Sequence, residues 1–422
     1  MARAQTIGEL KKSGYRVLSV KAEMRKNLVE MLRQGKSAFP GLVGYDETVL
    51  PQVENAILSG QDLVLLGERG QAKTRLARSL VHLLDPEVPT IAGCEINDDP
   101  YAPICQACRT KLAEQKDATE IEWIGRDRRY GEKLATPDIT IADLIGEVDP
   151  IKVAEGRYLS DELTIHYGLI PRTNRGIFCI NELPDLAERI QVGLLNVMEE
   201  RDVQIRGYKV RLPLDLYVVA SANPEDYTNR GRIITPLKDR FGSQVRTHYP
   251  RTLDHEISIM EAERTAFVDD VEVVIPRYME EIIAEITHLA RKSGDVSQRS
   301  GVSVRVSITS FENIVSNSVK RAIRLGEKQA APRVSDLPAV ISSVTGKIEI
   351  EALGDTREER IVDKLIQGAV LNCFNRYFRA QEFRDLVTRF DTGLTVEAGE
   401  SVASRQYAAR ALDLPGMRPA VT

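Results

Sequence analysis

The sequence lacks the features that mark a membrane protein or a secreted one. No apolar run approaches the roughly 20 residues that a membrane-spanning helix needs. The first residues, 1–9, lack the apolar centre of a secretion signal. With 5 cysteines in 422 residues, the chain also lacks the cysteine density of a disulfide scaffold. We therefore expect a cytoplasmic protein without a membrane segment.

An excess of positive charge is absent as well. The chain has 57 Lys and Arg residues against 62 Asp and Glu residues, and its formal net charge is −5. Surfaces that hold DNA or RNA are strongly basic, so this balance argues against a nucleic acid as the partner, although a local basic patch is compatible with it. The chain is too long for one compact core, and we expect two to three domains.

The segment 67–74, GERGQAKT, carries the strongest signal in the chain. It follows an apolar run at 63–66 and precedes a predicted helix. A strand, a glycine-bearing loop, Lys-Thr and a helix are typical of a phosphate-binding loop, because N–H groups at a helix N-terminus attract an anion. The alternative is an ordinary junction of strand, turn and helix. We predict nucleotide binding by Gly67, Glu68, Arg69, Gly70, Gln71, Ala72, Lys73, Thr74 and Arg75.

Three positions of this loop have individual predictions. Lys73 is expected to reach the outer phosphates, and Thr74 to place its hydroxyl on Mg²⁺. Ala72 stands where the pattern expects glycine. If that position needs a positive φ, the alanine Cβ costs about 1–2 kcal/mol.

The order of the apolar runs predicts an α/β fold. Runs at 177–180 and 216–220 are typical of buried strands in a parallel sheet, and a predicted helix at 186–200 lies between them. Such alternation indicates a sheet with helices on both faces. From residue 251 onwards, helical patterns at 254–267, 276–293, 306–325 and 356–385 predict a helical domain.

We expect the chain to divide as follows: an N-terminal helical segment at 1–38, with its helix at 15–36; an α/β nucleotide-binding domain at 39–250; a helical lid domain at 251–350; a C-terminal helical region at 351–398; and a tail at 399–422, either disordered or ordered against a partner. Within the α/β domain we expect an irregular insertion at about 94–135, a helix insert at about 150–166 and a hairpin at 201–212.

Polar residues that follow the predicted strands are candidates for the chemistry, because ligands bind at the carboxyl ends of parallel strands. Glu182 is expected to polarise the attacking water. Asn181 stands where an Asp helps to hold Mg²⁺, and an amide that reaches the metal only through a water predicts weak Mg²⁺ binding or slow turnover. Asn223 is expected to contact the water or the γ-phosphate.

Arg240 is the candidate that a neighbouring subunit supplies to the transferring phosphoryl group. The alternative is a surface arginine paired with Asp239 or Glu225.

Taken together and in this order, the motifs resemble an AAA+ ATPase. Further stretches at 39–47, 168–176 and 199–212 resemble the branch that contains the MoxR proteins and the ATPase subunit of magnesium chelatase. The resemblance covers about residues 39–310. It implies an AAA+ α/β domain with a helical lid, ATP and Mg²⁺ as cofactors, adenine contacts at Val43 and Gly44, and Arg305 as a nucleotide sensor in the lid.

The same resemblance implies a function. We expect an ATP-hydrolysing homo-oligomer, a hexameric ring, that acts as a remodelling or insertion chaperone on a partner protein, which in this branch often carries a von Willebrand A domain. Ala72 and Asn181 motivate the alternative of a nucleotide-dependent scaffold with little or no hydrolysis. Transcriptional activation by a related ATPase is a weaker hypothesis, since we find no helix-turn-helix with a basic recognition helix.

Three of the cysteines form a local cluster in the predicted insertion. Cys94, Cys105 and Cys108 are spaced C-x10-C-x2-C, and the Cys-x2-Cys part is typical of metal ligands. A closed zinc site takes four ligands, and His82, Asp98 and Asp99 are the candidates for the fourth. The standard parts of the resembled ATPases include no zinc, so the alternative to a structural zinc site is no metal at this cluster.

Overall fold

The protein's structure, a computed structural model, describes residues 3–149, 151, 154, 162–199, 212–223, 231–265, 271–297, 301–349, 355–414 and 417. The chain divides into two compact units. The first comprises Met1–Gly67 and Ala72–His248, and the second Glu68–Gln71 and Tyr249–Thr422. Residues 201–211 of the predicted hairpin at 201–212, and most of the predicted insert at 150–166, lie outside the described residues.

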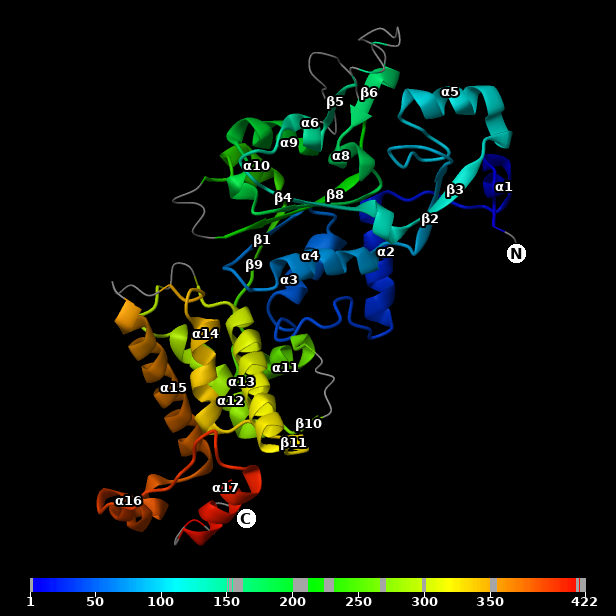
Figure 1. Cartoon of the computed structure of the whole chain (residues 1–422). Helices are drawn as coiled ribbons and strands as arrows, with labels where there is room; N and C mark the ends of the chain where they lie inside the picture. Colours follow the sequence, from blue (N-terminus) through cyan, green and yellow to red (C-terminus); the bar gives the residue numbers. More distant parts are fainter. Residues whose placement is uncertain are drawn as a thin grey trace. The chain divides into compact units, whose positions relative to one another are not determined.

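A five-stranded parallel sheet forms the centre of the first unit (Figure 1). Its strands are β1 (Leu63–Leu66), β4 (Tyr130–Leu134), β7 (Gly176–Asn181), β8 (Leu216–Ala222) and β9 (Ser243–Arg246). They lie in the order β4-β7-β8-β1-β9, and each neighbouring pair is parallel. The predicted α/β fold class is confirmed.

Helices cover both faces of this sheet (Figure 1). Leu63 and Leu65 of β1 belong to the buried cluster of one face, whereas Val64 and Leu66 belong to the cluster of the other. This alternation follows from the pleat of a strand, which sends successive side chains to opposite faces. The first face packs on α2 (Val20–Arg33), α3 (Leu50–Leu58) and α4 (Lys73–Ser79), and the second on α6 (Ile141–Leu144), α8 (Leu169–Arg172), α9 (Glu188–Glu199) and α10 (Thr235–Arg240).

The N-terminal helix starts later than the sequence predicts. The prediction of one helix over 15–36 is wrong at its start, because α2 begins at Val20, where the Ser19 side chain accepts a hydrogen bond from the Ala22 N–H. A separate short helix, α1 (Ile7–Lys12), precedes it. Serine at this position satisfies one of the unpaired N–H groups of the first turn and so fixes the helix boundary.

The stretch at 94–135 is not the irregular insertion that we predict. It contains α5 (Gln106–Gln115) and β3 (Ile121–Gly125), which pairs antiparallel with β2 (Glu87–Ile91). Its last residues form β4, which pairs with β7 at the edge of the central sheet. The pairing of β3 with β2 and that of β4 with β7 join residues far apart in the sequence. The sequence pattern alone does not show which strands pair.

A buried ion pair ties this stretch to the N-terminal helix. Arg129 donates two hydrogen bonds to Glu23 of α2, with Nη1–Oε1 at 2.8 Å and Nη2–Oε2 at 2.6 Å. The two side chains are 1% and 4% exposed. The Arg129 Nε also donates to the Arg175 carbonyl at 2.7 Å, and the Asp85 N–H donates to Glu23. Each charge therefore has several partners in place of water.

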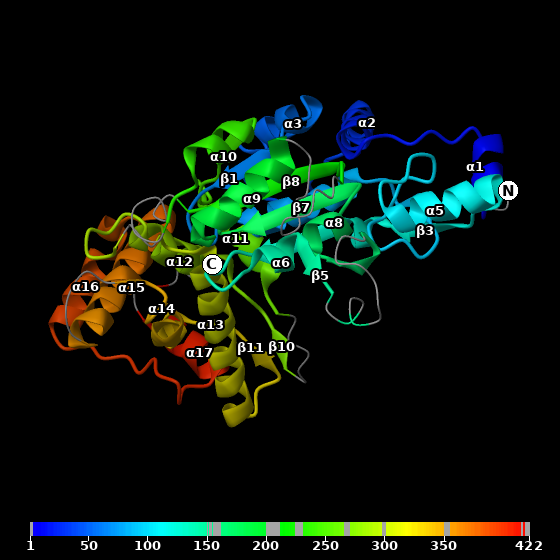
Figure 2. The same cartoon turned by 90° about the horizontal axis from the view of Figure 1, so that it is seen from above.

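The second unit is a helical bundle with its own core (Figure 2). Its main helices are α11 (Leu253–Glu263), α12 (Arg277–Ala290), α13 (Val304–Leu325), α14 (Ile341–Val344) and α15 (Asp355–Tyr377). The two-residue strands β10 (Glu272–Val273) and β11 (Gln329–Ala330) pair beside them. The tail contains a helix, α17 (Ser404–Asp413), whose first residue, Ser404, bonds to Glu327. A helical C-terminal region fits the predicted lid.

The remaining short elements are η1 (Leu80–Leu83), η2 (Lys116–Ala118), η3 (Arg126–Arg129), β5 (Gly146–Val148), η4 (Glu162–Thr164), β6 (Ile165–Tyr167), η5 (Leu183–Asp185), η7 (Val334–Val340), η8 (Ala380–Phe383) and α16 (Arg384–Asp391). Among the described residues, none of the helices has both the length and the apolar character needed to cross a bilayer.

Candidate nucleotide-binding site

The phosphate-binding loop starts where β1 ends and leads into α4. Ala72, the residue before the helix, has φ 53° and ψ 20°, which is the left-handed conformation. The glycine that the pattern expects would adopt it without steric cost, whereas the alanine Cβ crowds the backbone. The φ of Ala72 is therefore positive, and the alanine has the steric strain that we expect for such a conformation.

Replacing Ala72 with glycine is expected to raise the free energy of unfolding by about 1 kcal/mol, because the strain of the left-handed alanine is removed. Ala77→Gly is the matched control. It lies inside α4 and is expected to lower stability by about 1 kcal/mol. Thermal unfolding of the two variants measures the difference. A loss of stability in both would contradict strain at Ala72.

Lys73 lies at the carboxyl edge of the sheet, between two strand ends. Its side chain is buried, and its Nζ donates to the Gly67 carbonyl and to Oδ1 of Asn223, the latter at 2.5 Å. Gly67 follows β1 and Asn223 follows β8, and these two strands are neighbours in the sheet. The loop lysine and the predicted water-contacting residue are thus in direct contact.

Glu182 continues this chain of contacts. The Nδ2 of Asn223 donates to Glu182 Oε2 at 2.8 Å. Glu182 follows β7 and has φ 56°, and its N–H donates to Ser221 Oγ at 3.1 Å. The structure therefore brings together Lys73, Asn223 and Glu182, which the sequence places far apart. In phosphoryl-transfer enzymes, the side chain that orients the nucleophile lies near the groups that bind the phosphates.

Asn181 is also at this edge, but its amide is engaged by protein groups. Its Oδ1 accepts from Ser221 Oγ at 3.2 Å, and its Nδ2 donates to Glu132 Oε1 at 2.7 Å. Glu132 lies in β4 and accepts two hydrogen bonds from Arg78 of α4, at 2.7 and 3.0 Å. These bonds raise the pKa of Arg78 above its ordinary value. A carboxylate of the neighbouring strand, paired with Arg78, is therefore the hydrogen-bond partner of Asn181.

Comparison with known proteins finds similarities over parts of the chain. A family model described as the Sigma-54 interaction domain matches residues 155–240. The magnesium-chelatase subunit ChlI-2 of Arabidopsis thaliana chloroplasts is 25% identical over 366 residues, which is 85% of this chain and 73% of that protein. The ChlI subunit of Oryza sativa subsp. indica is 26% identical, over 72% of this chain and 73% of that protein. The ChlI-1 subunit of Arabidopsis thaliana is 29% identical, over 54% of this chain and 52% of that protein.

These similarities support an AAA+ ATPase of the magnesium-chelatase branch. The resemblance to that branch which the sequence motifs indicate is confirmed.

Sequence reasoning missed Glu132. No motif surrounds it, and it falls in the stretch that we predict as an insertion outside the sheet. Its contact with Asn181 spans 49 residues of sequence and arises only because β4 pairs with β7. The Cys179 thiol, which also faces Asn181, is buried in β7, and that burial raises its pKa to about 12.

Replacing Asn181 with Asp is expected to lower the free energy of unfolding of the nucleotide-free protein by about 1–3 kcal/mol. The new carboxylate cannot donate the hydrogen bond that Glu132 accepts from the Asn181 amide, and it places a second negative charge beside Glu132. Adding Glu132→Gln restores a donor and an acceptor and is expected to recover the loss. Thermal unfolding of the single and double variants, with and without Mg²⁺, measures both effects. Unchanged stability of N181D would contradict the Asn181–Glu132 contact.

The stretch predicted to lie against adenine is anchored within the first unit. Gly41 and Gly44 have φ of 80° and 78°, so the loop around Val43 makes turns that favour glycine. Tyr45 is buried, its hydroxyl donates to the His248 carbonyl at 3.0 Å, and burial raises its pKa to about 12. A Cβ built on Gly41 would lie 3.0 Å from Nη2 of Arg75, so this loop passes close to the first turn of α4.

The two predicted arginines differ in their surroundings. Arg240 pairs with Glu199 of α9, and not with Asp239; Glu225 lies outside the described residues. Its side chain is 46% exposed. Arg305 is exposed in the first turn of α13, in the second unit. The ion pair of Arg240 and the exposure of Arg305 do not assign a role to either side chain. The roles of both arginines stay predictions.

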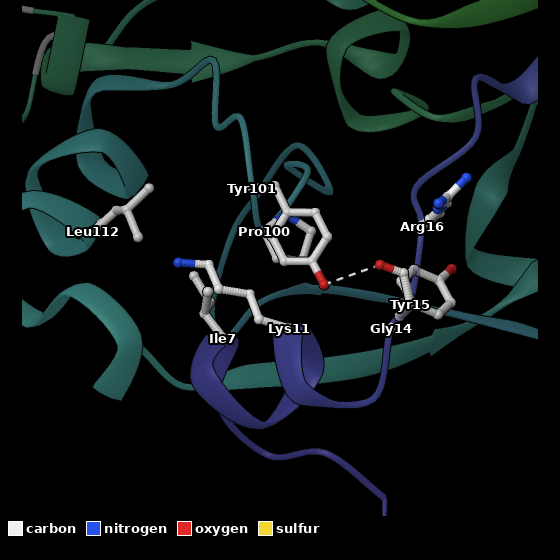
Figure 3. A pocket seen from close by; sticks show the side chains of 8 residues that line it. All are labelled: Ile7, Lys11, Gly14, Tyr15, Arg16, Pro100, Tyr101 and Leu112. Atoms are coloured by element: carbon white, nitrogen blue, oxygen red, sulfur yellow. Dashed lines mark hydrogen bonds between the residues drawn. The ribbon is translucent and has the colours of Figure 1, made fainter.

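A pocket of the first unit lies apart from these residues (Figure 3). Its wall includes the Tyr101 hydroxyl, which donates to the Tyr15 carbonyl at 3.2 Å. The lining consists of Ile7, Lys11, Gly14, Tyr15, Arg16, Pro100, Tyr101 and Leu112. None of the predicted nucleotide-binding residues contributes to it, so we assign it no part in binding ATP.

Proposed function

We propose that this protein hydrolyses ATP with Mg²⁺ and uses the energy to remodel a partner protein, or to insert a group into it. The observation that carries the proposal is the continuous contact from Lys73 through Asn223 to Glu182 at one edge of the sheet. Lys73 would bind the outer phosphates, Thr74 would hold Mg²⁺ and Glu182 would polarise the water. Asn181 would act on the metal only through a water.

The assembly is part of the same proposal. The resemblance to AAA+ ATPases supports a homo-oligomeric, hexameric ring in which Arg240 reaches the phosphate of a neighbouring subunit and Arg305 of the lid responds to nucleotide. It also supports a MoxR-like chaperone role on a partner with a von Willebrand A domain. Five cysteines that all remain unpaired suit the reducing cytoplasm.

Release of inorganic phosphate from Mg-ATP by the purified full chain tests the proposal. We expect turnover that requires Mg²⁺ and is lost in Lys73→Ala, because the loop then has no cation for the outer phosphates. ATP binding without phosphate release would instead support the nucleotide-dependent scaffold. If neither binding nor release is found, the protein is not an ATPase.

Arg240→Ala is expected to lower the rate of hydrolysis by at least about a hundredfold, since an arginine that contacts the transferring phosphoryl group contributes that much or more. Its control is Glu199→Gln, which breaks the ion pair and keeps the arginine.

Mixing Arg240→Ala with Glu182→Gln subunits distinguishes a residue supplied in trans from one supplied in cis. In random mixed rings, about a quarter of the interfaces combine an intact Glu182 with a neighbour's intact Arg240, so partial activity should return. No recovery in assembled mixed rings would contradict a role in trans, and full activity of Arg240→Ala alone would leave it a surface arginine.

A further inference from the structure

Four buried side chains of the first unit converge at a point that the nucleotide site does not use. Cys94, Asp98, Cys105 and Cys108 each offer a ligand atom, and these atoms all lie within 4.8 Å of one another. The sequence left three candidates for the fourth ligand. Asp98 is the one in the group, whereas His82 is exposed in η1 and Asp99 bonds instead to the Tyr101 N–H.

The spacing of the ligand atoms suits one tetrahedral ion. With Zn–S bonds of about 2.3 Å, tetrahedral geometry puts two sulfur ligands roughly 3.8 Å apart. The observed spread of up to 4.8 Å is therefore close to the size of a single-ion site. Three thiolates and one carboxylate are also the ligand types that zinc prefers among the available side chains.

The backbone around these residues favours thiolates. The Asp98 N–H donates to Cys94 Sγ at 3.3 Å, and the Cys108 N–H donates to Cys105 Sγ at 3.4 Å. Cys105 is also the N-cap of α5, where the helix dipole stabilises a negative charge. Hydrogen bonds from the backbone to ligand atoms are the usual way in which a protein orients a metal's ligands.

Asp98 supplies an independent sign of a missing partner. The residue is fully buried, at 0% exposed. Its Oδ2 accepts from the Cys105 N–H at 3.0 Å, but its Oδ1 is buried without a hydrogen-bond partner. An unsatisfied buried acceptor costs about 1–3 kcal/mol, and it is rare unless an ion or a water completes it. A metal ion bound by the three sulfurs would give Asp98 Oδ1 a partner.

We propose that Cys94, Cys105, Cys108 and Asp98 form a structural zinc site. All four ligands come from the protein and all are buried, so no coordination position is left for a substrate. Such closed sites contribute to folding and not to catalysis. The buried Arg175 donates to the Asp98 carbonyl at 3.4 Å and so places a positive charge beside the anionic ligand set.

The position of the site suggests what it stabilises. Two hydrogen bonds join the loop 94–98 to the segment that leads into β7: Asn97 Nδ2 donates to the Arg172 carbonyl at 2.9 Å, and Asn174 Nδ2 donates to the Ile96 carbonyl at 3.1 Å. Zinc would fix α5 and this loop against the sheet edge of the same unit. Removing zinc should therefore lower the free energy of unfolding. It should change the rate of ATP hydrolysis per folded molecule only slightly.

Metal analysis of the full chain, purified without chelators, tests the proposal directly. We expect about one zinc per chain, released when a mercurial reagent blocks the thiols. Asp98→Asn is expected to weaken zinc affinity at least tenfold, as judged by competition with a chelating dye, since changes even outside the ligand set cost that much. Asp99→Asn is the matched control, because it alters the adjacent carboxylate, which is not in the group, and it should leave the affinity unchanged.

Cobalt substitution keeps the test valid if a variant fails to fold. The wild-type chain stripped of metal and given Co²⁺ should show the strong visible absorption of a tetrahedral thiolate site, and Asp99→Asn should show it too. A wild-type protein that contains no zinc, gives no such absorption and has all three thiols free to react would overturn the proposal. So would stoichiometric iron in place of zinc.

Discussion

Replacing Glu182 with glutamine is expected to lower the turnover number for ATP by at least about a hundredfold and to leave ATP affinity nearly unchanged. General-base assistance contributes roughly 10²–10⁴ in rate, and the amide has no basic oxygen to take up the water's proton. The amide oxygen still accepts the hydrogen bond that Asn223 now donates to Glu182, so the geometry at the end of β7 should be preserved.

Two measurements separate this effect from a structural one. Phosphate release gives the turnover number, and calorimetric titration with Mg-ATP gives the affinity. Glu188→Gln, an exposed carboxylate in the first turn of α9, is the control and should retain full activity. Turnover that survives in Glu182→Gln would remove Glu182 from the proposed role and would point to another base at the strand ends.

Replacing Arg129 with methionine is expected to lower the free energy of unfolding of the first unit by about 3–5 kcal/mol, because it leaves the buried Glu23 carboxylate without its cation. Desolvation of an unpaired charge outweighs the apolar contacts that methionine adds. The effect should exceed that of any exposed ion pair, such as that of Lys11 with Asp117, which is worth at most about 1 kcal/mol.

The single tryptophan makes this loss measurable. Trp123 lies in β3, within the first unit, so its fluorescence during denaturant unfolding follows that unit and not the helical one. Adding Glu23→Leu to Arg129→Met should recover much of the loss, because both charges are then removed together. A double variant that is no more stable than Arg129→Met would show that the ion pair is not the source of the effect.

Residues at strand ends could be predicted because their position depends on local pattern. The glycine-bearing loop, Asn181-Glu182 and Asn223 each follow an apolar run, and the carboxyl ends of parallel strands meet at one edge. That rule predicts that Lys73, Asn223 and Glu182 lie near one another. What the sequence could indicate was the neighbourhood and not the individual hydrogen bonds.

Residues whose partners come from distant strands could not be predicted in this way. Glu132 meets Asn181 only because an edge strand pairs with β7, and Arg129 meets Glu23 across 106 residues. Asp98 could not be distinguished from Asp99 as the fourth member of the cysteine cluster. The backbone turns at Asn97, which has φ 52°, and such a turn has no clear signal in the sequence.

The left-handed residues carry a consequence for how this protein can evolve. Ala72 and Glu182 both adopt a conformation that glycine or asparagine would accept at lower energy. A library selected only for heat resistance should therefore enrich glycine at position 72 and glycine or asparagine at position 182. The first exchange leaves a phosphate loop of the common kind, whereas the second discards the carboxylate, so only selection for turnover would keep glutamate there.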